Sequence, residues 1–183
     1  MSSNNNNVRN WGKIPSRVLM KLVKIVSLFN HHMYMKCYTW LLKKQGMDIT
    51  GSPIYIGAST SFDGEDYSKI HIGDSTVISS EVRFLTHDYS ISRAIEATGR
   101  KLEKEVFQLK DIFVGKNCFI GTRSIIMPGC HLGDNVIVGA GSVVRGKIPD
   151  NSIVIGNPAQ IVGNTIEWAE KKLKQGEYST NTY

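Results

Sequence analysis

A six-residue repeat in the second half of the chain constrains the fold more than any other feature. From Val114 onward the sequence reads VGKNCF, IGTRSI, IMPGCH, LGDNVI, VGAGSV and VRGKIP. The first position is always branched aliphatic, the second is Gly in four of the six hexads, and the fifth is small or apolar. An α-helix cannot hold this register, because six is not a multiple of 3.6. Short strands joined by sharp turns can. The pattern therefore predicts a parallel β-helix whose aliphatic residues point inward and stack from coil to coil, with Gly allowing tight corners.

The repeat continues, less regularly, towards the N-terminus. IGDSTV from Ile72 and ISSEVR from Ile78 fit it, FLTHDY from Phe84 begins another unit, and IYIGAS from Ile54 is interpreted as a degenerate first rung. Together these segments predict a solenoid domain over residues 51–160, interrupted by a charged stretch at 88–111. A long loop inside a compact domain is often functional, so we expect this one to cover a ligand site or to reach a neighbouring subunit. A tolerated insertion is the alternative.

Three segments lie outside the solenoid. Residues 1–15 include the polar tract SSNNNN and are predicted to be disordered. Residues 16–50 are predicted to be helical as far as Lys44, with Ser16 as the cap. Their apolar residues recur at helical spacing: Val18, Leu22, Ile25, Val26, Phe29 and Met33. We expect this helix to pack on the solenoid or on a neighbouring subunit, in preference to a membrane surface. Residues 161–183 are predicted to form a helix from Ile161 to Lys174 and a frayed tail.

Composition narrows the range of partners. The 183 residues suffice for one domain with a core, and 22 Lys and Arg against 16 Asp and Glu give a net charge of +6. A basic balance suits an anionic ligand, partner or surface, but RNA-binding signatures and zinc-finger spacings are missing, so nucleic acid is not expected. Cys37, Cys118 and Cys130 are too few for a disulfide framework, and the last two, at fifth hexad positions, are predicted to be buried and inert. With no signal peptide or membrane-length apolar run evident, a cytoplasmic protein is expected.

Three motifs accompany the hexads: Thr86-His87-Asp88, Gly139-Ala140-Gly141-Ser142 and Gly156-Asn157-Pro158-Ala159. Over roughly residues 52–163 the chain resembles the hexapeptide-repeat acetyltransferases. It is most similar to the maltose, galactoside and nodulation O-acetyltransferase branch, which includes capsule and lipopolysaccharide enzymes. The resemblance implies an all-β solenoid, a left-handed parallel β-helix with three hexads per coil. It also implies a homotrimer with each active site between two subunits. Residues 18 apart then stack, which places Val114 on Leu132 and Ile120 on Val138.

His87 is the candidate catalytic base. It is fourth in its hexad, an outward position, directly before the interruption, and imidazole titrates near neutrality. The resemblance implies that it deprotonates an acceptor hydroxyl, which attacks acetyl-CoA directly. Glu105 resembles a family residue that contacts the base or the acceptor; Asp88 is the other candidate for orienting His87, and Glu103 is a rival to Glu105. His31, His32, His71 and His131 are interpreted as structural or solvated, with the last two at corners of the coil.

The resemblance also implies a binding site for acetyl-CoA as acyl donor, in the second half of the solenoid. Small residues would line a groove for the pantetheine arm, basic residues would meet the phosphates, and the GNPA segment would close the adenine end. The residues that match are Thr122, Gly139, Ala140, Ser142, Arg145, Lys147, Asn157, Pro158 and Ala159. Family members often carry basic residues directly after GNPA, whereas Gln160 and Gly163 stand here. Part of the phosphate contact is therefore in question, unless Lys171 and Lys172 supply it.

Several functions remain open at this stage. Acetyl transfer to the hydroxyl of a sugar or sugar-nucleotide acceptor is preferred, and N-acetylation of a nucleotide-linked amino sugar or an amine-bearing xenobiotic is the alternative. A metal-dependent hydratase of the same fold would need three His ligands with a close pair, a pattern that His71, His87 and His131 do not offer, so no metal is expected. A non-catalytic solenoid that serves as a trimeric scaffold or as a CoA binder is the fourth hypothesis.

Overall fold

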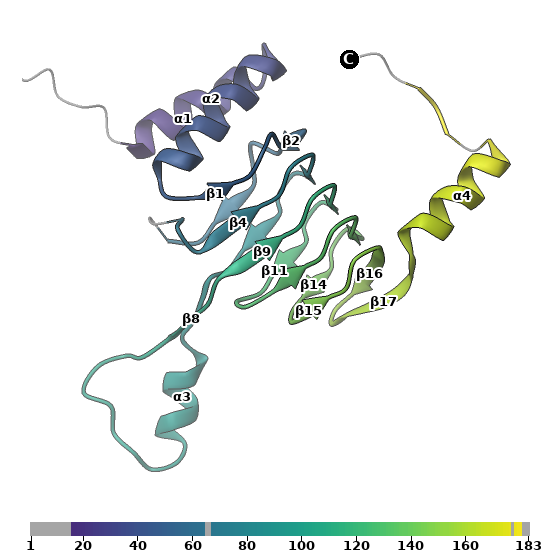
Figure 1. The fold of residues 1–183 in the computed structure, drawn as a ribbon. Coiled ribbons are helices and arrows are strands. Elements are labelled where there is room, and N and C mark those ends of the chain that lie inside the picture. Colours follow the sequence, from purple (N-terminus) through teal and green to yellow (C-terminus); the bar gives the residue numbers. More distant parts are fainter. Residues whose placement is uncertain (1–15, 65–66, 177, 181–183) are drawn as a thin grey trace, which may run out of the picture.

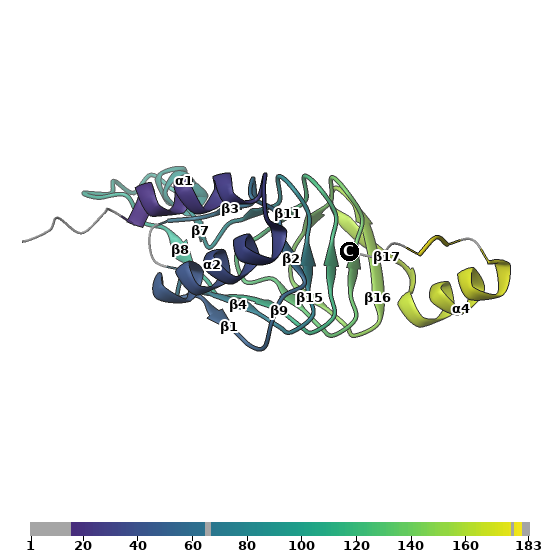
Figure 2. The ribbon, with the colours of Figure 1, turned by 90° about the horizontal axis from the view of Figure 1, so that it is seen from above.

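The computed structural model describes residues 16–64, 67–176 and 178–180, and it is a solenoid of stacked coils capped by helices at both ends (Figure 1). The segment 1–15, predicted to be disordered, lies outside the described residues. Two helices, α1 (Ser16–Val26) and α2 (His31–Lys44), lie over the first coil, and α4 (Thr165–Gln175) follows the last. Figure 2 shows the coils in a row between α2 and α4. Among the described residues, no helix is both long enough and apolar enough to span a bilayer.

Three sheets of short parallel strands form the sides of the solenoid, and strand order follows the coils. The first sheet contains β1 (Asp48–Ile49), β4 (Ile70–Ile72), β9 (Ile112–Val114), β12 (His131–Leu132) and β15 (Lys147–Ile148). The second contains β2 (Tyr55–Ile56), β5 (Val77–Ile78), β10 (Phe119–Ile120), β13 (Ile137–Val138), β16 (Ser152–Gly156) and, antiparallel at its end, β17 (Ala159–Asn164). The third contains β3 (Ser61–Phe62), β6 (Arg83–Phe84), β11 (Ile125–Ile126) and β14 (Val143–Val144).

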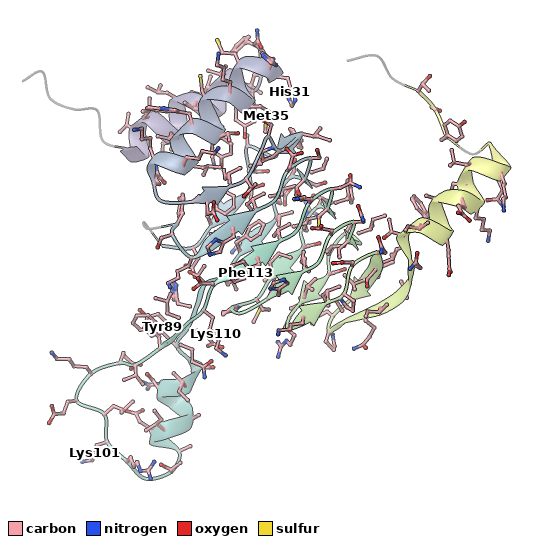
Figure 3. All side chains as sticks on the ribbon, in the orientation of Figure 1. His31, Met35, Tyr89, Lys101, Lys110 and Phe113 are labelled. Atoms are coloured by element: carbon pink, nitrogen blue, oxygen red, sulfur yellow. The ribbon has the colours of Figure 1, made fainter. Side chains whose placement is uncertain are left out.

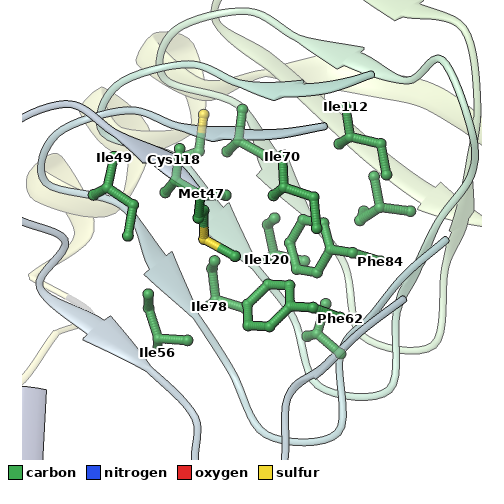
Figure 4. Packing of buried hydrophobic residues seen from close by; sticks show 14 of the residues in the cluster. Met47, Ile49, Ile56, Phe62, Ile70, Ile78, Phe84, Ile112, Cys118 and Ile120 are labelled. Atoms are coloured by element: carbon green, nitrogen blue, oxygen red, sulfur yellow. The ribbon is translucent and has the colours of Figure 1, made fainter. Parts of the chain in front are cut away.

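The hexad positions explain the short strands. The sixth residue of one hexad and the first of the next form each strand, with the sixth facing outward and the first facing the core. Val114 pairs with Leu132 and Ile120 with Val138, which confirms the predicted stacking of residues 18 apart. First and fifth positions are buried throughout the repeat, and their stacked side chains form the core that Figure 4 shows from close by. This continuous apolar column is what holds successive coils together.

Glycine at the second hexad position has a different purpose from the one predicted. A Cβ on Gly115 would lie 2.4 Å from the carbonyl oxygen of Gly133 in the next coil, so glycine is needed there because two backbones approach closely. The sharp corner is instead at the fourth position, where Asn117, Arg123 and Asn135 have φ of 53°, 60° and 59°. Asn tolerates this left-handed conformation well, and the Asn117 amide also donates to the Asn135 side chain at 2.8 Å.

The N-terminal helix differs from the prediction in two ways. The chain turns at residues 27–30, so the predicted helix to Lys44 is two helices, and Asn30 starts the second by accepting a hydrogen bond from the Met33 N–H at 2.8 Å. The predicted apolar stripe is also mostly exposed. The helices bury a different set instead: Val23, Tyr34, Met35, Tyr38, Leu41 and Leu42. The solenoid begins at β1, slightly before the predicted residue 51.

Two further segments refine the sequence-based boundaries. Residues 161–164, predicted to be helical, belong to β17, and α4 begins only after Asn164, whose side chain accepts from the Ile166 and Glu167 N–H groups. The interruption leaves the solenoid through β7 (His87–Asp88), contains α3 (Ser90–Glu96), and returns through β8 (Gln108–Leu109), antiparallel to β7. It projects from the body in Figure 1, where the solenoid resumes directly at β9.

Candidate active site

His87 lies where the chain leaves the solenoid, and Asp63 holds its imidazole. Asp63 directly follows β3, and β3 pairs with β6, so this carboxylate lies beside the residues that follow β6. Its Oδ2 lies 2.6 Å from Nδ1 of His87. The same oxygen accepts the backbone N–H groups of Thr86 at 3.0 Å and of His87 at 3.3 Å. The imidazole and the start of the loop are therefore fixed by one carboxylate.

This contact assigns a chemical role to each nitrogen of the ring. A carboxylate at Nδ1 favours the tautomer that carries its proton there, which leaves Nε2 as the atom able to accept a proton. The carboxylate also stabilises the imidazolium that proton transfer would produce, as in other acid–base pairs of this type. The His87 side chain is 32% exposed and that of Asp63 only 14%, so the base reaches solvent while its partner is largely covered. The pair is suited to general-base chemistry on a ligand at the surface.

Two aromatic residues of the loop form a wall against the imidazole. Tyr89 meets His87 edge-on with ring centroids 5.3 Å apart, and Phe107 does so at 6.1 Å. The centroids of the Tyr89 and Phe107 rings lie 4.9 Å apart, although Tyr89 precedes α3 and Phe107 precedes β8. Figure 3 shows Tyr89 and Lys110 near the base of the loop, far from Lys101 at its tip. The base of the loop is therefore part of the site, whereas the tip projects away from it.

Neither orienting residue predicted from the sequence contacts His87 within this chain. The Glu105 carboxylate bonds the Arg93 guanidinium, and hydrogen bonding from Ser92 and then Arg93 lowers the pKa of Glu105. Asp88 accepts the Ser90 N–H at 2.8 Å, a contact that lowers its pKa. Both carboxylates therefore hold the loop. The contact that we expected Glu105 or Asp88 to make is made by Asp63.

Asp63 was not identified from the sequence because the first hexad was taken to begin at Ile54, two residues before its start at Ile56. The buried residues of that rung are Ile56, Thr60 and Phe62, whereas Ile54 is exposed. Read from Ile56, the hexad IGASTS has Gly in second position and Thr in fifth, as the pattern requires, and Phe62 starts the next. That phase stacks Phe62 on Phe84 and would have placed Asp63 beside the His87 segment.

The predicted acetyl-CoA residues fall into three places. Thr122, Gly139 and Ala140 lie in turns between the second and third sheets, where the Gly141 N–H donates to the Thr122 carbonyl oxygen at 2.8 Å. Arg145 follows β14, at the opposite edge of the third sheet, and Lys147 faces outward on β15. Asn157 and Pro158 form the exposed connection between β16 and β17. A single chain thus does not gather these residues around one point.

Ser142 does not present its side chain to a ligand, contrary to expectation. It is fully buried. Its hydroxyl donates to the Gly139 carbonyl oxygen at 2.6 Å and accepts the Gly156 N–H at 3.1 Å. Ser142 therefore shapes the turn that carries Gly139 and Ala140. The exposed surface of that turn comes from Ala140 and Gly141, beside the exposed Thr122 of the preceding coil.

Basic residues lie on the same side of the solenoid as His87. Arg145 and Lys110 both contribute to the lowered pKa of Asp88, after the Ser90 hydrogen bonds, so their positive charges lie near that carboxylate. Arg145 is exposed and lies in the coil stacked beyond β11. An anionic group near the base of the loop would meet a positive potential there.

Four further candidates occupy structural places: His71, His131, Cys118 and Cys130. His71 and His131 lie in strands on the outer face of the first sheet, not at corners, because sixth hexad positions belong to strands. His71 stacks on Phe113 at 4.3 Å, and its two nitrogens contact Asp48 at 3.0 Å and Asp111 at 3.3 Å. Burial raises the pKa of Cys118 to about 11 and of Cys130 to about 12, so both thiols stay protonated. Over the described ranges, no three His, Cys, Asp or Glu side chains are grouped to hold a metal ion.

Comparisons with known proteins agree with this architecture. The model of the bacterial transferase hexapeptide (six repeats) family matches residues 111–146. Protein CapG of Staphylococcus aureus is 36% identical over 138 residues, which cover 75% of this chain and 77% of CapG. The galactoside O-acetyltransferase of Escherichia coli is 31% identical over 117 residues, covering 61% of this chain and 54% of that enzyme.

A solved structure extends the likeness to nearly the whole chain. A galactoside acetyltransferase in complex with coenzyme A superposes with a TM-score of 0.59 at 20% identity, covering 92% of this chain and 86% of the other. Likeness at this level of identity concerns the fold, and it confirms the predicted left-handed parallel β-helix with helices at its ends.

Proposed function

This chain belongs to the hexapeptide-repeat acetyltransferases, and from that membership we propose that it transfers the acetyl group of acetyl-CoA to a sugar hydroxyl. The observation that carries the proposal is the Asp63–His87 pair at the base of an aromatic loop. The sugar hydroxyl as acceptor is suggested by the similarity to a galactoside O-acetyltransferase. The acceptor class is a saccharide or a polysaccharide precursor.

The reaction would proceed by direct attack. Nε2 of His87 takes the proton of the acceptor hydroxyl as its oxygen bonds to the thioester carbonyl carbon, giving a tetrahedral intermediate with an oxyanion. Asp63 stabilises the imidazolium through Nδ1. The intermediate collapses by breaking the carbon–sulfur bond, and the leaving CoA thiolate takes the proton back from the imidazolium. The products are the acetyl ester and CoA, and no enzyme group is acetylated.

Acetyl-CoA would bind to residues of more than one chain. Thr122 and Ala140 lie in two stacked turns at one edge of the solenoid, whereas the basic side chains of Arg145 and Lys147 lie away from that edge. Asn157 and Pro158 lie at the end of the solenoid. In a homotrimer, one copy can bring its Ala140 turn to the His87 edge of the next. The apolar outer surface supports such an assembly: Phe119, Ile155 and Trp168 are each exposed by more than 40%, and among the described residues α4 buries none.

The test is release of the CoA thiol from acetyl-CoA across a panel of sugars, nucleotide-linked amino sugars and amine compounds. We expect turnover with a sugar hydroxyl and at least a ~100-fold loss in His87→Ala, because base catalysis by a positioned side chain is typically worth that much or more. His32→Ala, which changes an exposed histidine on α2, is the matched control and should keep full turnover. Retained activity in His87→Ala would show that His87 is not the base. Turnover confined to amines would show that the enzyme is an N-acetyltransferase.

A further inference from the structure

The N-terminal helices expose apolar side chains on the side that faces away from the solenoid. Helix α1 packs on α2, burying Val23, while one end of the molecule presents six apolar residues to solvent. We call this set the apolar ridge: Val18, Leu22, Ile25, Leu28, Phe29 and Met33. Phe29 is 84% exposed and Leu28 77%, both in the turn that joins the two helices. Contiguous exposed apolar residues of this kind mark a surface that another phase or molecule covers.

The spacing shows that the ridge follows one side of α1. Val18, Leu22 and Ile25 are separated by four and three residues, so they lie on one face over two helical turns. Met33 continues the ridge into the first turn of α2. The opposite side of α1 makes its own contacts with the protein, because Lys24 donates to the Thr60 carbonyl oxygen at 3.4 Å and lies over the Tyr38 ring. The exposed apolar face is therefore not needed to hold α1 on the protein.

The charged residues at this end of the chain are all basic. The first 47 residues contain eight Lys and Arg and no Asp or Glu, so the other 136 residues contain 14 basic and 16 acidic side chains. The whole net positive charge of the protein therefore originates in this segment. Exposed cations on the helices include Lys21 beside the ridge, and Lys36, Lys43 and Lys44 along α2, with Lys44 over the exposed Trp40 ring. An amphipathic helix with apolar residues flanked by Lys is the composition that binds anionic lipid surfaces.

We propose that α1 and the turn to α2 dock on an anionic phospholipid membrane, with the apolar ridge in the interfacial layer and the lysines against the headgroups. Charge complementarity selects this occupant over a second copy of the chain, since contacts between copies at this end, about a two-fold or a three-fold axis, would bring equally basic surfaces together. The ridge lies at the end of the solenoid remote from α4, so docking leaves the sheets accessible (Figure 1). Sequence spacing favoured packing of this helix on the solenoid or on a neighbouring subunit. The apolar face does not pack on the solenoid of its own chain, and the charge of the segment leads us to prefer a membrane to a neighbouring subunit.

The experiment is co-sedimentation of the intact protein with vesicles, without acetyl-CoA, so that it does not depend on the acetyl-transfer proposal. Vesicles of phosphatidylcholine with about a third phosphatidylglycerol should bind the protein. Vesicles of phosphatidylcholine alone should bind it at least ~10-fold more weakly, and about 0.5 M NaCl should release much of it. The double variant Ile25→Ser/Phe29→Ser should lose at least ~10-fold in vesicle affinity. Lys21→Glu/Lys36→Glu should lose binding to the anionic vesicles with its thermal midpoint unchanged.

Leu109→Ser/Leu173→Ser is the matched control, because it removes two apolar side chains of similar exposure from the loop and α4. It should bind vesicles as the wild type does. Three results would overturn the proposal: no binding of the wild type to anionic vesicles, equal binding by Ile25→Ser/Phe29→Ser, or a smaller oligomeric mass of that variant in light scattering. The last result would show that the ridge is an interface between copies.

Discussion

One oxygen of Asp63 contacts both the side chain and the backbone of the His87 segment: Oδ2 lies 2.6 Å from Nδ1 of His87 and 3.0 Å from the Thr86 backbone nitrogen. This carboxylate therefore joins two adjacent coils at the point where the chain leaves the solenoid at His87. Orientation of the imidazole and entry of the loop therefore depend on the same carboxylate.

The first prediction separates these two roles. Asp63→Asn keeps an oxygen for the backbone N–H groups but removes the charge that stabilises the imidazolium, so we expect kcat to fall ~100-fold or more with the KM for acetyl-CoA little changed. Asp63→Ala also leaves those N–H groups without their acceptor and should lower the thermal midpoint by several degrees. Steady-state kinetics and thermal unfolding of both variants distinguish the effects. Normal turnover in Asp63→Asn would show that the carboxylate only shapes the loop.

The second prediction concerns the proposed site between chains. His87→Ala and Ala140→Trp should each be inactive alone, the first through loss of the base and the second by filling the turn assigned to acetyl-CoA. Mixed trimers of the two should recover part of the turnover, because some junctions would pair an intact His87 with an intact Ala140 turn. A mixture of His87→Ala with Asp63→Asn is the control. It should recover nothing, since those two residues act within one chain.

The third prediction tests the close approach of coils. Gly115→Ala would place a methyl group 2.4 Å from the Gly133 carbonyl oxygen, so the coils must separate locally. We expect a loss of about 2 kcal/mol or more in the free energy of unfolding. Gly163→Ala is the matched change, because its Cβ would only touch Ile153 at 3.8 Å, and it should be nearly neutral. Equal thermal midpoints for the two variants would contradict this explanation of the repeat.

The fourth prediction concerns acid stability. Asp74 accepts the Ser52 N–H of the preceding coil at 2.6 Å, and this bond, followed by that from Ser75, holds the pKa of Asp74 below its usual range. The folded state then gains stability above the pKa of unfolded Asp, about 3.9, and loses it as pH falls through the lower folded value. Asp74→Asn should therefore lose less stability than the wild type on acidification, whereas Glu170→Gln should follow the wild type. Thermal midpoints between about pH 7 and pH 3 measure this.

The sequence predicted most of the fold because the hexads are a local code. First and fifth positions face a shared core, so the solenoid from Val114 and the stacking of Ile120 on Val138 could be read directly. Regions without the repeat were less predictable. The apolar spacing continues through residues 27–30, so it did not reveal the turn between the two helices, and it did not show which side of α1 is buried.

The candidate site was predictable in part, since His87 was identified by its place before the loop. Its partner was not, because Asp63 precedes it by 24 residues and becomes a neighbour only through the pairing of β3 with β6. The role of Ser142 likewise depends on a tertiary contact, the Gly156 N–H, that no local motif encodes.

The 88–111 excursion leaves and rejoins the solenoid at a single place. Its two ends run side by side as the antiparallel strands β7 and β8. The coils on either side of it stack without a gap, since β4 pairs with β9, Ile70 with Ile112 and Ile72 with Val114. The coil therefore imposes almost no limit on how long the excursion is or what it contains. Under the proposed function, exchange of this one segment would change the acceptor preference while the scaffold and the Asp63–His87 pair stay unaltered.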